Sequence, residues 1–110
     1  MRLSFLHMTI NIRGAQIELT DAIRQYVEEK MATLEKFGEI ALVDAEVGKT
    51  TERHQKGDIF FCRANIEMPG DMVRVERESE DLYKAIDKVR DHLRETLAQR
   101  KDRKIDERKG

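Results

Sequence analysis

The chain has few of the residues that build crosslinked or membrane-spanning proteins. Its 110 residues include no tryptophan, one proline and one cysteine. The lone Cys62 excludes an internal disulfide framework and is typical of a reducing compartment, so we expect a cytoplasmic protein. No segment approaches the roughly 20 consecutive apolar residues of a transmembrane helix, so we expect no membrane association.

Histidines and cysteine are too scattered to suggest catalysis. His7, His54 and His92 lie in three separate predicted segments, and none is at metal-ligand spacing from another. Cys62 lies among apolar residues of a predicted strand, where a thiol is usually inert. Phosphate-binding loops and hydrolase motifs are also missing. We therefore expect no enzyme activity, metal, cofactor or small-molecule substrate.

The length and composition predict one small domain. Apolar and charged residues each make up 39% of the chain, which allows a modest core under a heavily charged surface. Residues 1–7 lack the apolar run of a secretory signal and are interpreted as an N-terminal extension. We place the domain at residues 8–104 and a charged tail at 105–110.

The first half of the chain has the pattern of a strand, a helix and a second strand. Apolar and polar residues alternate from Met8 to Arg13 and again from Ala41 to Val47. Between them Thr20 suits a helix N-cap and Gly38 suits a helix end. The buried side of this helix is predicted from residues at helical spacing, namely Ile23, Val27, Met31, Leu34 and Phe37.

The second half predicts a polar loop, a hairpin and a long helix. The loop is Gly48–Asp58, and the hairpin joins strands Phe60–Met68 and Met72–Glu78 through a type II turn at Pro69-Gly70. Cys62 falls on the buried side of its strand, whereas Phe61 is the aromatic residue expected on the open face. The expected class is α+β, with the order β-α-β-β-β-α and a four-stranded sheet carrying both helices on one face.

The last helix combines an apolar stripe with a basic surface. Ser79 is predicted as its cap, with Glu80 and Asp81 in the first turn. The stripe consists of Leu82, Ile86, Val89, Leu93 and Leu97, and it fades afterwards, so Arg100–Gly110 is expected to fray. From Lys84 onward the chain has ten Lys/Arg against six Asp/Glu, whereas Met1–Tyr83 has eleven against sixteen.

The basic end suits either binding to RNA phosphates or a solvated mixed-charge surface. Lys84, Lys88, Arg90 and Arg94 are interleaved with Asp87, Asp91 and Glu95, a pattern that is also common on soluble helices. Charge alone therefore does not separate the two interpretations.

Short motifs in order along the chain resemble the ribosome hibernation promoting factor family. They include Glu18-Leu19-Thr20, Ala22-Ile23-Arg24, Leu34-Glu35-Lys36 and above all Asp81-Leu82-Tyr83-Lys84-Ala85-Ile86-Asp87. The resemblance spans about Met8 to Lys104. It implies a non-enzymatic silencer of translation that binds the small ribosomal subunit and the whole ribosome, and occupies the messenger and transfer-RNA channel under stress.

The same resemblance implies which cations face ribosomal RNA. They are Arg24, Lys30, Lys36, Lys84, Lys88 and the region from Lys101 to Lys104. The charge pattern of the last helix adds Arg90 and Arg94, so the candidates are Arg24, Lys30, Lys36, Lys84, Lys88, Arg90, Arg94, Lys101, Arg103 and Lys104. Where relatives often carry lysine or arginine, this chain has Thr33, His92, Glu95 and Gln99, so we expect a rotated or weaker basic face. The chain resembles the short members, which lack the extra domain used to pair ribosomes.

Two other functions remain open from the sequence. A general double-stranded-RNA module also ends in a basic helix on a sheet, although Glu80–Lys84 does not match its lysine cluster. A protein-binding regulator could instead use the acidic part of the chain, Met1–Tyr83. Salt sensitivity separates the RNA functions from the protein function.

Overall fold

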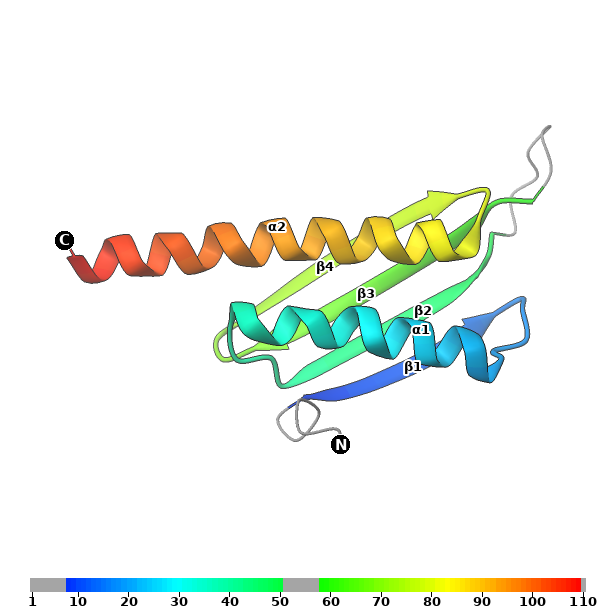
Figure 1. The fold of residues 1–110 in the computed structure, drawn as a ribbon, viewed down its shortest axis with the longest axis horizontal. Coiled ribbons are helices and arrows are strands. Elements are labelled where there is room, and N and C mark those ends of the chain that lie inside the picture. The colour runs from blue at the N-terminus through cyan, green and yellow to red at the C-terminus, as the bar shows by residue number, and fades with distance from the viewer. Residues whose placement is uncertain (1–7, 51–57, 110) are drawn as a thin grey trace.

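The fold consists of four strands and two long helices in the order β-α-β-β-β-α (Figure 1). It was obtained as a computed structural model that describes residues 8–50 and 58–109, with side chains described as far as Lys101. The elements are β1 (Thr9–Ala15), α1 (Asp21–Ala32), the 3₁₀ helix η2 (Thr33–Phe37), β2 (Leu42–Lys49), β3 (Phe60–Met68), β4 (Asp71–Ser79) and α2 (Leu82–Lys109).

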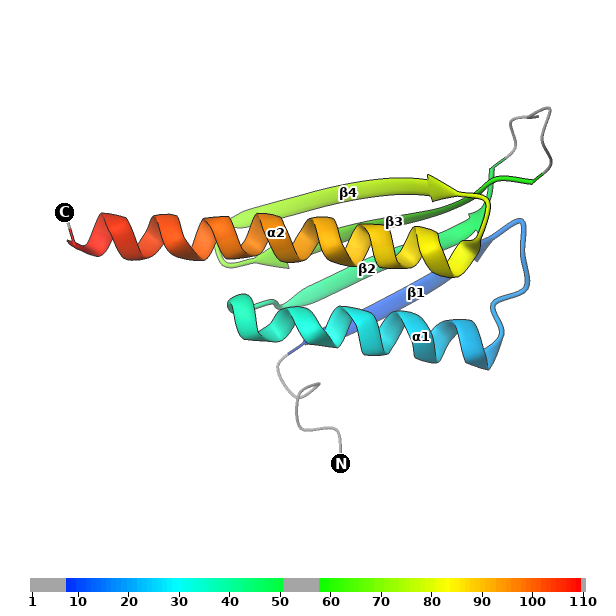
Figure 2. The same cartoon turned by 45° about the horizontal axis from the view of Figure 1, so that its top comes forward.

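The strands form one mixed sheet in chain order. β1 pairs with β2 in parallel, with Ile12 opposite Ala45, and the other two pairings are antiparallel. The parallel pair is possible because α1 carries the chain back across the sheet. Both helices cover the same face, and α2 continues past the end of the sheet (Figures 1 and 2). The predicted α+β class and arrangement are confirmed.

The core lies between the helices and this covered face. Every second residue of β2 and β3 points into it, as the alternation predicted. The predicted helix stripes meet these residues, and Cys62 is fully buried among them. The fully buried members include Val27, Met31, Leu34, Val43, Ala45, Cys62, Ala64, Ile66, Ile86, Val89 and Leu93.

The predicted start and end of the first helical segment are largely confirmed. The Thr20 hydroxyl accepts a hydrogen bond from the Ile23 amide at 3.2 Å, as expected for an N-cap. The α-helix itself ends at Ala32, and η2 extends the helical segment to Phe37. Gly38 follows with a φ of 153°, a conformation that glycine adopts without a side-chain clash.

The predicted cap of the last helix was wrong. Ser79 ends β4, and α2 begins at Leu82. Asp81 is the capping residue, because its Oδ1 accepts a hydrogen bond from the Tyr83 amide at 2.9 Å and its carbonyl accepts one from Ala85 at 3.0 Å. The Ser79 hydroxyl supports the turn by accepting a hydrogen bond from the Asp81 amide at 3.3 Å.

The predicted fraying of Arg100–Gly110 was also wrong as far as Lys109, because α2 continues to that residue. The segment Arg100–Lys109 contains neither glycine nor proline, and most of its residues are strong helix formers such as lysine, arginine and glutamate. Local helix propensity therefore continues beyond the apolar stripe. The predicted tail at 105–110 is helical as far as Lys109.

The hairpin between β3 and β4 has the predicted turn. Met68 pairs with Asp71, which leaves Pro69 and Gly70 as the two turn residues. Gly70 has a φ of 75°, as the second central position of a type II turn requires. The strand before the polar loop is longer than predicted, because β2 includes Gly48 and Lys49, and residues 51–57 of that loop lie outside the described part.

Candidate nucleic-acid interface

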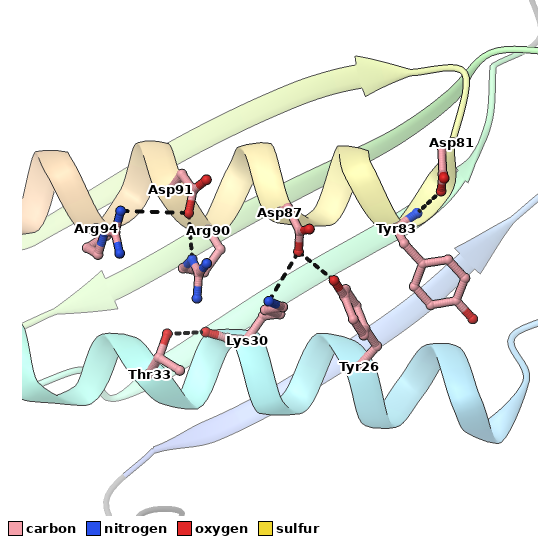
Figure 3. Close-up of polar contacts among 9 residues, drawn as sticks. All are labelled: Tyr26, Lys30, Thr33, Asp81, Tyr83, Asp87, Arg90, Asp91 and Arg94. Carbon is pink, nitrogen blue, oxygen red and sulfur yellow. Dashed lines mark hydrogen bonds and ion pairs between the residues drawn. The ribbon is translucent and has the colours of Figure 1, made fainter.

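The two long helices run side by side in the same direction, with facing polar stripes (Figures 1 and 3). Tyr83, Asp87, Arg90 and Arg94 follow one another at steps of four, three and four residues on α2, so they share one side of the helix. On α1 the facing residues are Tyr26 and Lys30. We call these six residues the interhelical seam.

Asp87 joins the two helices at the centre of the seam (Figure 3). The Tyr26 hydroxyl donates a hydrogen bond to its Oδ1 at 2.7 Å, and the Lys30 ammonium lies 3.4 Å from the same oxygen. The hydrogen bond to Asp87 is the larger cause and desolvation the smaller one, and together they raise the pKa of Tyr26 to about 12. Lys30 also lies 5.1 Å from the Tyr26 ring centroid, close enough for a cation–π contact.

The two arginines of the seam differ in their exposure and in their distance from the nearest carboxylate. Arg90 Nε lies 2.8 Å from Asp91 Oδ1, and the Arg90 side chain is 19% exposed. Arg94 is 54% exposed, and its nearest approach to Asp91 is 4.0 Å. Since such surface ion pairs contribute at most about 1 kcal/mol, a phosphate can compete with Asp91 for both guanidinium groups.

The remaining predicted cations do not join the seam. Lys84 and Lys88 lie on the β4 side of α2, where they line an open hollow with Glu78, and Lys88 Nζ donates to the Glu78 carbonyl at 3.2 Å. Arg24 precedes Tyr26 by two residues, a rotation of about 200° that places it on the far side of α1. The predicted single basic face is therefore divided between both sides of each helix.

A third group of cations lies near the end of η2. Lys101 Nζ donates to the Lys36 carbonyl at 3.4 Å, which ties α2 to η2, and Lys36 Nζ lies 5.3 Å from the Phe37 ring centroid. The side chains of Arg103 and Lys104 lie outside the described part of the structure. RNA contact by any of the ten candidates stays a prediction.

The open face of the sheet is a charged ladder. Arg63 on β3 contacts Glu46 on β2 at 2.7 Å and Glu76 on β4 at 3.3 Å. The hydrogen bond to Glu76 raises the pKa of Arg63, and the opposing effect of desolvation is smaller. Phe61 also lies on this face, but it is only 7% exposed and its ring centroid lies 5.3 Å from the Arg63 guanidinium. The prediction that Phe61 is exposed on the open face was therefore wrong, because Arg63 lies over its ring.

In the described part of the chain we looked for a reactive thiol, a metal site and a membrane-spanning helix. Burial raises the pKa of the Cys62 thiol to about 12, which makes it a poor nucleophile. Residues 8–50 and 58–101 contain no cluster of three or more His, Cys, Asp or Glu side chains that could hold a metal ion. None of the described helices is long and apolar enough to cross a membrane.

Sequence reasoning missed the bond that organises the seam. Tyr26 and Asp87 are 61 positions apart, and neither residue type signals a long-range partner. In the sequence Asp87 interrupts the basic pattern and closes the Asp81–Asp87 motif, and neither feature points to a contact with α1. The helical spacing of Tyr83, Asp87 and Arg90 placed them on one side of α2, but it did not reveal that this side faces α1.

Comparison with known proteins assigns the chain to a family. Residues 10–105 match the family model described as "Sigma 54 modulation protein / S30EA ribosomal protein". The ribosome hibernation promoting factor of Azotobacter vinelandii is 34% identical over 103 residues, covering 94% of this chain and 92% of that protein. The ribosome hibernation promotion factor of Lactococcus lactis is 33% identical over 96 residues, covering 84% of this chain and 49% of that protein.

Solved structures agree with this assignment. The crystal structure of the Thermus thermophilus Protein Y N-terminal domain aligns with a TM-score of 0.69 and 35% identity, covering 84% of this chain and 98% of that chain. Membership of a family of binding proteins agrees with the expectation that the chain is not an enzyme. Sequence and fold together show that the chain belongs to the ribosome hibernation promoting factor family.

Proposed function

We propose that the protein binds the small ribosomal subunit and the whole ribosome, and silences translation by occupying the messenger and transfer-RNA channel. The observation that carries this proposal is the placement of both cation-bearing helices on one side of the sheet, in a chain that belongs to this family (Figure 2). The mechanism is steric. A rigid domain fills the channel and excludes messenger and transfer RNA, while its lysines and arginines pair with ribosomal-RNA phosphates.

The local contacts of these cations support an electrostatic mode of binding. Within the described residues, Arg24 and Lys84 make no ion pair, whereas Lys30 and Arg90 already contact Asp87 and Asp91. A phosphate must displace or share these acidic partners. We therefore expect affinity to fall steeply with salt, since each phosphate contact adds about 0.7 to 0.9 to the salt slope.

Co-sedimentation with purified ribosomes and separated subunits tests this proposal. The folded protein should pellet near-stoichiometrically with the small subunit and with whole ribosomes at low salt, and be released as salt increases. Ribosomes already filled with messenger and transfer RNA should bind much less of it. Failure to bind empty small subunits, with the fold intact by circular dichroism, would contradict the proposal.

A matched pair of charge reversals separates specific binding from general attraction. Lys84→Glu removes a cation from the helix layer, and Arg74→Glu makes the same charge change on the open face. We expect the first to weaken small-subunit binding and the second to leave it nearly unchanged. Equal binding to any RNA duplex would instead favour a double-stranded-RNA module, and binding that resists nuclease and high salt would favour a protein partner.

A further inference from the structure

Tyr83 is an exposed aromatic residue at one end of the seam. Its side of α2 faces α1, and the residue is 39% exposed. Among the described residues, Met72 is the other large hydrophobic residue with comparable exposure, at 55%, and it lies on the open face of the sheet. The helix layer therefore displays one large apolar side chain to solvent, among cations.

The Tyr83 ring is supported on one side by Tyr26. It packs edge to face on Tyr26, with ring centroids 4.8 Å apart and an interplanar angle of 89°. Tyr26 is itself fixed by its hydrogen bond to Asp87 and by the Lys30 contact. Because Tyr26 supports the ring, Tyr83 itself loses little further conformational freedom when a partner stacks on it.

The Tyr83 hydroxyl makes no hydrogen bond to the described part of the chain, in contrast to that of Tyr26. The Tyr83 side chain is therefore anchored by its ring alone. A purely structural role would be fulfilled by burying the ring between the helices, yet more than a third of the residue remains in solvent. This combination of a supported ring and an open surface is typical of a stacking platform.

Cations continue from this ring along the seam. Asp87 with its bound Lys30 lies one helical turn beyond Tyr83, and Arg90 and Arg94 lie two and three turns beyond it (Figure 3). A single RNA strand offers both a charged backbone and flat unpaired bases. The seam matches both features, because phosphates can contact the cations while a base meets the aromatic end.

We infer that Tyr83, supported by Tyr26, stacks on an unpaired base of a single-stranded RNA segment whose phosphates lie along Lys30, Arg90 and Arg94. This inference rests on the proposed function and specifies the form of RNA bound at its site. A duplex is a poor occupant of this platform, because its bases are already stacked on one another.

Substitution of Tyr83 tests the inference through affinity and salt dependence together. Tyr83→Leu keeps helix propensity and apolar contact with Tyr26 but removes the flat ring, so Kd for the small subunit should rise about tenfold, the size expected for one lost base stack. Tyr83→Phe should bind like the original protein. The salt slope should not change, because no charge is removed. Met72→Ala is the matched control and should bind normally.

Two results of this series would overturn the inference. One is unchanged affinity of a folded Tyr83→Leu protein in conditions where the original protein binds small subunits. The other is an equal loss in Tyr83→Phe, because that would assign the effect to the hydroxyl rather than to the ring. Failure of the original protein to bind small subunits contradicts the proposed function itself, and the platform is then judged by fluorescence.

Tyrosine fluorescence detects stacking without ribosomes. The chain has no tryptophan and two tyrosines, so the difference in emission between the original protein and Tyr83→Phe reports on Tyr83 and leaves the bond between Tyr26 and Asp87 intact. Titration at low salt with a short unstructured RNA should quench the Tyr83 emission, whereas a duplex of the same length should quench it much less. Absence of quenching by saturating single-stranded RNA, or equal quenching by the duplex, would overturn the inference.

Discussion

The open face of the sheet and the helix layer arrange their charges in different ways. On the open face, Arg13, Arg63 and Arg74 each contact an acceptor on a neighbouring strand. On the helix layer, Arg94 is more than half exposed, and its nearest carboxylate oxygen lies at the limit of an ion pair. Arg63 is held on both sides by carboxylates of the sheet, whereas Arg94 remains available to a partner.

This difference shows why a count of charges is a poor guide to binding. The net charge of the whole chain is −1, and even the division into an acidic and a basic part does not separate paired from available groups. A cation held by carboxylates on both sides, such as Arg63, must lose those contacts before it binds a phosphate. Under the proposed function, the local partners of each cation therefore decide which face is available to RNA phosphates.

Adjacent residues of β3 provide the largest expected contrast between the two faces. Ile66 is fully buried under the helices, whereas Asn65 points to the open face and accepts a hydrogen bond from Arg74. Ile66→Ala should lower the free energy of unfolding by about 2–5 kcal/mol. Asn65→Ala should cost about 1 kcal/mol or less. Urea denaturation measures both, and similar losses would show that the open face also forms a core.

Two aspartates of α2 provide the next contrast, within the helix layer. Asp87→Ala leaves the Tyr26 hydroxyl and Lys30 without their shared acceptor, and should lower the free energy of unfolding by about 1–3 kcal/mol. Asp91→Ala removes contacts with Arg90 and Arg94 on its own helix, and should cost less than about 1 kcal/mol. Equal thermal stability of the two variants would refute the linking role of Asp87.

The charged ladder is expected to contribute less than the seam. Arg63→Met removes the contacts with Glu46 and Glu76 but keeps an unbranched apolar side chain near Phe61. Because the ion pairs are partly exposed, the loss should be below about 1 kcal/mol and should shrink in high salt. A loss in urea denaturation that exceeds that of Asp87→Ala would reverse the order proposed for the two faces.

The smallest effect is a pH dependence confined to alkaline solution. The raised pKa of Tyr26 means that the folded protein favours the protonated phenol, which keeps its hydrogen bond to Asp87. The contribution to stability is complete below the ordinary tyrosine pKa of about 10 and is lost as pH approaches 12. Absorbance titration at alkaline pH should show one phenol ionising near 12, and Tyr26→Phe should abolish that step.

The sequence predicted the elements better than the contacts between them. Alternation from Phe60 to Met68 and the helical stripe from Leu82 to Leu97 identified the buried sides, because periodicity reports directly on which side of an element is apolar. The cap was harder to predict, since Ser79 and Asp81 both have capping side chains and the choice depends on where β4 ends. Local propensity also extended α2 beyond its apolar stripe.

The sequence predicted which residues could form the candidate site, but it did not predict how they are arranged in space. Lys30, Arg90 and Arg94 were identified as cations, yet their meeting at one seam depends on the packing of α1 beside α2. The exposure of Tyr83 and the burial of Phe61 were likewise invisible to periodicity. In each case the position or exposure of the residue depends on a neighbour that lies far away in the sequence or close to it on the same strand. No local pattern in the sequence identifies that neighbour.

Paired charge reversals measured across a salt series test the central claim most directly. Arg90→Glu with Arg94→Glu alters the seam, and Arg13→Glu with Arg74→Glu makes the same charge change on the open face. The account predicts that the seam pair loses most small-subunit binding and reduces the salt slope by about two, while the open-face pair binds nearly as well as the original protein. Equal losses for two folded pairs, or a larger loss for the open-face pair, would contradict it.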